Sequence, residues 1–118
     1  MKLWIDDVRP APEGYCWCET VMEAKASIQW LEENYKHVER MYLEGRADED
    51  DLRCYTIELL DLDHDAGDCA QYGGDYIKLL DWLEETGRNY PIRIHSMNPV
   101  GVANMRAIIE RNGWKEIK

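Results

Sequence analysis

Acidic side chains and two histidines follow directly after apolar segments of this sequence. Asp6 and Asp7 come after one apolar run, the segment 59–68 (LLDLDHDAGD) carries four aspartates and a histidine, and His95 and Ser96 come after a third run. Carboxylate oxygens are the ligands that Mg²⁺ prefers, and this ion usually keeps waters and shares a substrate phosphate. The pattern therefore predicts a divalent-cation site built from several segments.

Both histidines in these segments, His64 and His95, lie next to the acids in the predicted arrangement. A histidine passes protons in either direction near neutral pH, and a neighbouring carboxylate raises its pKa and holds its ring. We therefore interpret the two as a general acid and base pair. The alternative for His95 is a partly buried strand residue that hydrogen-bonds to the backbone.

Each aspartate also has an ordinary structural role open to it. Asp7 could form a salt bridge with Arg9, and Asp61 and Asp65 could cap turns. For any one aspartate this interpretation is as good as the metal site. For the whole set the metal site is favoured, because three separate segments bring polar residues to the same edge of the predicted sheet.

Hydrophobic periodicity predicts strands that alternate with helices. The strands are expected at 2–5, 15–18, 55–63, 91–96 and 114–117, and the helices at 20–35, 75–87 and 99–112. Such alternation predicts a parallel sheet covered on both faces, with its ligand site at the carboxyl ends of the strands. Residues 37–54 either extend the first helix or form a second one.

The connection between the first two strands is too short for a usual parallel crossover. Residues 6–14 must make this connection, whereas a parallel crossover ordinarily takes roughly a dozen residues or more. Either this connection lacks a helix or the second strand lies elsewhere.

The charge of the chain limits its partners. It has 118 residues with 14 Lys and Arg against 24 Asp and Glu, a net charge of −10. This excess repels nucleic acid and anionic lipid at long range, so a phosphate substrate needs a local cation. The sequence has no apolar run of the ~20 residues that span a membrane and no signal peptide, which predicts a single cytoplasmic domain without a membrane partner.

Four stretches of the sequence together resemble one family. The stretches LWIDDVRPAPEGY, LDHDAGD, GGDYIKLLDWLEE and IRIHSMNPVGVANM are similar to the cyclic-phosphate processing receiver domain, a relative of the receiver domains of response regulators. The resemblance implies a flavodoxin-like, three-layer α/β sandwich with a mostly parallel five-stranded sheet and a shortened first helix. It covers one domain, 1–118, in which 37–54 is an atypical acidic insert or a helix extension.

The same resemblance assigns roles to nine residues. It implies Mg²⁺ ligands at Asp6, Asp7 and Asp63, phosphate-binding groups at Arg9, Ser96 and Asn98, and catalytic groups at His64, Asp65 and His95. A competing register places Asp61 where Asp63 stands, since LLDL also fits the third strand of a receiver. We prefer Asp63 because DHDAG matches the family motif better.

Three functions are compatible with this resemblance. The first is a Mg²⁺-dependent phosphoesterase acting on a phosphate-containing small molecule or an RNA end, with nucleotide or RNA 2′,3′-cyclic phosphate as the implied substrate. The second is a signalling domain that accepts a phosphoryl group on Asp63, and the third is a regulatory domain without catalysis. Receivers carry a lysine after their fifth strand, and Lys118 stands just after the last predicted strand here.

Overall fold

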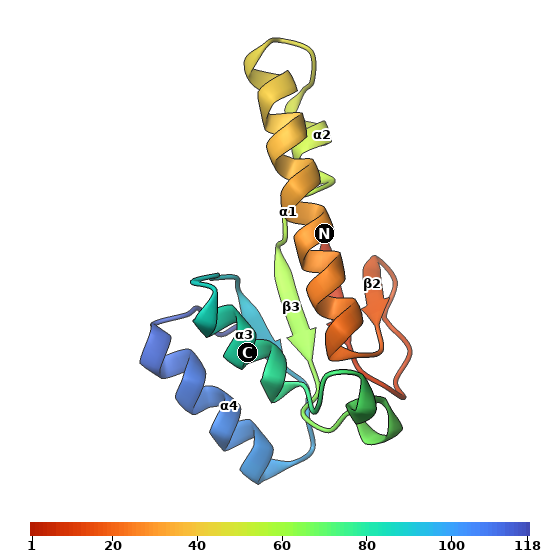
Figure 1. Ribbon diagram of the computed structural model, residues 1–118, viewed down its shortest axis with the longest axis vertical. Helices are drawn as coiled ribbons and strands as arrows, with labels where there is room; N and C mark the ends of the chain where they lie inside the picture. The colour runs from red at the N-terminus through yellow and green to blue at the C-terminus, as the bar shows by residue number, and fades with distance from the viewer.

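A four-stranded parallel sheet forms the centre of the protein. The computed structural model describes residues 1–118, and its strands lie side by side in the order β2-β1-β3-β4 (Figure 1). The strands are β1 (Lys2–Ile5), β2 (Tyr15–Cys18), β3 (Leu59–Leu62) and β4 (Ile92–Ile94). All three pairings are parallel, as predicted. The connection 6–14 between β1 and β2 contains no helix, which resolves the question of the short crossover.

Helices follow each later strand. They are α1 (Val21–Leu43), α2 (Glu49–Arg53), the 3₁₀ helix η1 (Gly67–Tyr72), α3 (Ile77–Glu85) and α4 (Pro99–Asn112). Local sequence sets the ends of the longest two. The Thr20 hydroxyl accepts from the Glu23 amide at 2.9 Å and begins α1. Asn98 caps α4 before Pro99, and Gly113 ends it in the left-handed conformation with φ 66°.

The predicted fifth strand does not form. Segment 114–117 makes only an isolated parallel bridge, between Ile92 and Glu116, beside the edge strand β4. Two hydrogen bonds hold it there, from the Ile92 amide to the Lys115 carbonyl and from the Ile117 amide back to Ile92. The prediction of a five-stranded sheet is therefore wrong, because this segment pairs through one residue and not along a ladder.

Helices cover only one face of the sheet. The main core of 20 buried residues joins alternate strand positions, such as Leu3, Ile5 and Leu60, to the apolar sides of α1, α3 and α4. The intervening positions, such as Trp4 and Arg93, point to the opposite face and lie outside this core. The predicted three-layer sandwich is thus a two-layer structure, because loop 6–14 replaces the helix that would begin a third layer.

Segment 37–54, for which the sequence allowed either an extended first helix or a second helix, is mainly helical. Its first part continues α1 to Leu43, well beyond the predicted end near residue 35. The acidic run then forms the short helix α2, whose first turn is closed by reciprocal bonds between Asp48 and Asp51. Figure 1 shows that the second half of α1, with α2 against it, extends beyond the sheet. No helix has both the length and the hydropathy to cross a bilayer.

Candidate functional site

Three carboxylates meet at the carboxyl edge of the sheet. Asp6 and Asp7 directly follow β1, and Asp63 directly follows β3. Each offers one oxygen to a group whose ligand atoms all lie within 4.8 Å of one another. β1 and β3 are neighbouring parallel strands, with Ile5 paired to Leu62, so the residues that follow them emerge together. The structure thus places Asp63, and not Asp61, beside Asp6 and Asp7.

The carboxylate of Asp6 is held firmly in place. It is fully buried, and its Oδ1 accepts from the backbone amides of Val8 at 2.9 Å and Arg9 at 3.0 Å. Burial opposes ionisation, but these two amides and the hydrogen bond with His95 outweigh it, so the pKa of Asp6 lies below its usual value. Asp6 is therefore a preorganised carboxylate.

The pKa of Asp7 is shifted in the opposite direction, above its usual value. Burial raises the pKa of its carboxyl, and the negative charges of Asp6 and Asp63 raise it further, against a lowering hydrogen bond from its own amide. A methyl group added to Gly67 would lie 2.6 Å from Oδ2 of Asp7, so only glycine lets this loop approach so closely. The carboxylates of this cluster are crowded, and a cation among them would relieve their repulsion.

His95 links two buried acids. Its Nε2 lies 2.8 Å from Oδ2 of Asp6, and its Nδ1 lies 2.7 Å from Oδ1 of Asp61. Its ring stacks on the indole of Trp4, with centroids 3.8 Å apart and planes 2° apart. His95 therefore joins the carboxylates of Asp6 and Asp61 through both of its ring nitrogens. The alternative in which His95 bonds to the backbone through its ring does not occur.

Asp61 belongs to the middle of the sheet and not to a turn. It is completely buried in β3, paired in register with Trp4 on one side and Arg93 on the other. Besides His95, its carboxylate contacts the guanidinium of Arg93 at 3.3 Å and the hydroxyl of Tyr15 at 3.5 Å. Its proposed role as a turn cap is wrong, because it lies inside a strand.

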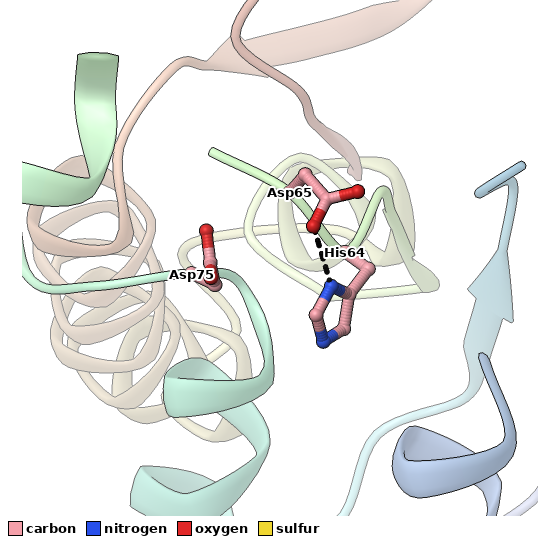
Figure 2. A group of neighbouring side chains, drawn as sticks. All are labelled: His64, Asp65 and Asp75. Carbon is pink, nitrogen blue, oxygen red and sulfur yellow. Dashed lines mark hydrogen bonds and ion pairs between the residues drawn. The ribbon is translucent and has the colours of Figure 1, made fainter. Parts of the chain in front are cut away.

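A second cluster, formed by His64, Asp65 and Asp75, lies next to the three carboxylates. Nδ1 of His64 lies 2.9 Å from Oδ1 of Asp65, which leaves Nε2 without a protein partner. The Asn98 amide donates to both oxygens of Asp65, at 3.4 and 3.3 Å. Figure 2 shows the bonded pair, with Asp75 approaching from the segment that leads into α3. The hydrogen bond with His64 is the main reason that the pKa of Asp65 is lowered.

The predicted phosphate-binding residues surround this edge. The Ser96 hydroxyl oxygen accepts from the backbone amide of Asn98 at 3.1 Å, so the hydroxyl hydrogen is free to donate. Arg9 donates to the His95 carbonyl at 2.8 Å and lies 4.0 Å from Oδ2 of Asp6, with its side chain 46% exposed. Lys118 is exposed and forms no hydrogen bond or ion pair. The basic side chains nearest Asp6 are thus His95 and Arg9.

Sequence reasoning missed several residues that shape the site. Trp4, Asp75, Arg93 and Gly101 were not among the predicted groups. A methyl group on Gly101 would lie 2.4 Å from Cγ of His64, so the ring packs flat against the first turn of α4. The alternation of side chains along each strand, which places Trp4, Asp61 and Arg93 on one face of the sheet, was a usable signal. The contact between His64 and Gly101 leaves no pattern in the local sequence.

A concave pocket of the molecule lies away from this site. It has a volume of about 520 Å³ and is lined by residues of α1 and of the segments before β3 and β4, such as Tyr35, Tyr55 and Tyr90. These segments lie at the amino ends of the strands. None of the predicted site residues lines it. The candidate site is instead formed by converging side chains, which a metal and a small phosphate need more than a deep cavity.

A parallel α/β sheet with acids after its first and third strands and a serine after its fourth defines a receiver-type domain. The sequence profile of the cyclic-phosphate processing receiver domain matches residues 1–111, and the chain belongs to this family. Searches of curated proteins and of solved structures gave no significant match.

Proposed function

We propose that this protein is a divalent-metal-dependent phosphoesterase. The observation that carries the proposal is the convergence of Asp6, Asp7 and Asp63 within 4.8 Å, beside a histidine whose second ring nitrogen is free. The family description supplies the substrate class, a cyclic phosphate. Nucleotide or RNA 2′,3′-cyclic phosphate is the form of it that we propose.

The three carboxylates fit a hard cation such as Mg²⁺. All their offered atoms are oxygens, and Asp6 is fixed by two backbone amides while Asp7 and Asp63 approach from different loops. Oδ1 of Asp63 accepts from the His64 amide at 2.7 Å, and its other oxygen makes no protein hydrogen bond. A bound cation would neutralise charge developing on the phosphate and offset the acidic field of the chain.

His64 is our candidate for the proton-transfer group. Hydrolysis adds water to phosphorus and breaks one ring P–O bond, so the departing ribose oxygen needs a proton. Asp65 bonds to Nδ1 of His64 and thereby orients the ring, which leaves Nε2 for that transfer. Both nitrogens of His95 are bonded to carboxylates, so we assign His95 the different role of positioning Asp6.

Ser96 and Arg9 complete the proposed site as polar contacts for the phosphate, and Asn98 supports it. The free hydroxyl hydrogen of Ser96 and the guanidinium of Arg9 are suitable donors to phosphoryl oxygens. Asn98 acts indirectly: its side-chain oxygen caps α4 by accepting from the Gly101 backbone amide at 3.0 Å, while its side-chain amino group donates to Asp65.

Turnover of adenosine 2′,3′-cyclic phosphate, followed by chromatography of the monophosphate product, tests this function. We expect hydrolysis with Mg²⁺ and none with excess chelator. Replacing His64→Gln should lower kcat by at least about 100-fold, the usual contribution of a general acid or base. The control His37→Gln changes an exposed residue of α1 and should have no effect. A native protein without turnover, or a fully active His64→Gln variant, would refute the proposal.

A phosphoacceptor role is the second candidate, because Asp63 stands directly after β3 beside Asp6 and Asp7. A phosphoryl group on Asp63 would add negative charge to a cluster in which the pKa of Asp7 is already raised. Incubation with acetyl phosphate and Mg²⁺, followed by intact-mass measurement, distinguishes the two roles. We expect no covalent adduct.

A further inference from the structure

The sheet face that carries no helix has its own chemistry. In-register pairing places Trp17, Trp4, Asp61 and Arg93 in one row across all four strands, and places Tyr15 beside Lys2 in the next row. We call these six residues the open face. Cys18 and Leu3, at the intervening positions of the same strands, belong to the core on the other side. The open face is therefore a true side of the sheet and not a loop surface.

Aromatic rings and cations dominate what the open face presents to solvent. Trp17 is 41% exposed, and the Lys2 ammonium lies 5.5 Å from the ring centre of Tyr15. The Arg93 side chain is 46% exposed, while its partner Asp61 is fully buried. In a chain with a net charge of −10, this face therefore exposes cations and no strand carboxylate.

The open face runs directly into the candidate site. Trp4 stacks on His95, which bonds to Asp6, and the Trp4 indole donates to the Arg9 carbonyl at 2.9 Å. The Trp17 indole donates to the Asp6 carbonyl at 2.7 Å. Both tryptophans of the row are thus tied to the loop that carries the first acid pair, so the exposed part of the open face adjoins that loop.

We propose that the open face binds single-stranded RNA and leads its 3′ end, with the terminal phosphate, to the acidic edge. Base rings would stack on Trp17 and Tyr15, and Lys2 and Arg93 would contact backbone phosphates. Exposed aromatics on a sheet flanked by cations recognise unpaired bases and phosphates in this way. RNA is the occupant we choose because a 2′,3′-cyclic phosphate requires the ribose 2′-hydroxyl. This inference rests on the proposed function for its substrate end.

Fluorescence anisotropy with a labelled single-stranded RNA of about ten nucleotides ending in a 3′-phosphate tests the inference, using the full chain at low salt. Stacking contributes about 1–3 kcal/mol per base, so Trp17→Ala should weaken binding about fivefold or more. Lys2→Gln changes an exposed residue, and should weaken binding and flatten its salt dependence by about one phosphate contact. Trp30→Ala, which removes a 57% exposed indole from α1, and Lys78→Gln on α3 are the matched controls.

The outcomes separate this inference from the proposed function. Equal RNA affinity in the native protein, Trp17→Ala and Lys2→Gln, or equal binding of DNA of the same sequence, would overturn the inference, whether or not the mononucleotide is hydrolysed. Selective loss of RNA binding in both variants, with both controls unchanged, would support it. Failure to hydrolyse adenosine 2′,3′-cyclic phosphate would overturn the phosphoesterase proposal and leave the binding result in place.

Discussion

Nδ1 of His95 lies 2.7 Å from Oδ1 of Asp61, which ties the end of β4 to the middle of β3. Nε2 of the same ring lies 2.8 Å from Asp6 at the end of β1. One imidazole thus joins three strands at the edge where the candidate site forms, and both acids that it bonds are fully buried.

Replacing His95→Gln is predicted to destabilise the protein strongly. Two buried carboxylates would lose their shared hydrogen-bond partner, and each buried polar group left unsatisfied costs about 1–3 kcal/mol. Urea unfolding at pH 7 measures this loss, with His37→Gln on the exposed side of α1 as the control. A loss below about 1 kcal/mol in His95→Gln would show that the bridge does not hold the site together.

Replacing Gly101→Ala is predicted to destabilise the protein, although alanine is ordinarily the better helix former by about 1 kcal/mol. The added methyl would lie 2.4 Å from Cγ of His64 and force its ring away from Asp65. Such overpacking usually costs about 1–3 kcal/mol. Urea unfolding of a double-mutant cycle with His64→Ala tests the cause, because the methyl should be harmless once the imidazole is absent. Equal effects of Gly101→Ala in both backgrounds would rule out the steric contact.

The sequence predicted the parts of the fold that depend on local pattern. The strand before Asp6, and α4 between Asn98 and Gly113, were predicted correctly because an apolar run and capping residues mark them. The strand before Asp63 was predicted in the right place but begins at Leu59 and not at residue 55. The length of α1 was not predicted correctly, because its last turns pack against α2 and not the sheet, and none of residues 37–43 is buried. The third layer is missing because no helix covers the second face of the sheet, and no local sequence pattern predicts such an absence.

The candidate site was predictable in its membership but not in its connections. Asp6, Asp7 and Asp63 follow strands, and the parallel order alone brings them to one edge. The bridge from His95 to Asp61 depends on side-chain directions across three strands. It could be inferred only after the register was known, since Asp61 also fitted a turn or a metal ligand.

Glu32 is predicted to stabilise the protein at neutral pH and not in acid. Burial raises the pKa of its carboxyl, but hydrogen bonds from Arg88 and Tyr90 outweigh this effect, so its pKa in the folded protein lies below the unfolded value. The stabilisation is therefore complete above the unfolded pKa and is lost as the pH falls through the folded pKa. We expect Glu32→Gln to cost about 1–3 kcal/mol at pH 7, as for hydrogen bonds to charged groups.

Urea unfolding of the native protein and of Glu32→Gln, from pH 7 down through the folded pKa of Glu32, measures the difference between their free energies of unfolding. The gap between the two should close as the pH falls, whereas Glu33→Gln, an exposed neighbour on α1, should match the native protein throughout. A gap that stays constant with pH would mean that Glu32 acts through packing and not through its charge.

Titration of the metal-free protein with Mg²⁺ by isothermal calorimetry tests most directly whether Asp6, Asp7 and Asp63 share one cation. We predict one ion per chain, weakened at least about tenfold by Asp63→Asn, since removing a ligand charge costs more than 1 kcal/mol. Asp75→Asn, which alters the neighbouring group of His64, Asp65 and Asp75, should bind as the native protein does. Absence of binding to the native protein, or unchanged affinity in Asp63→Asn, would contradict the account.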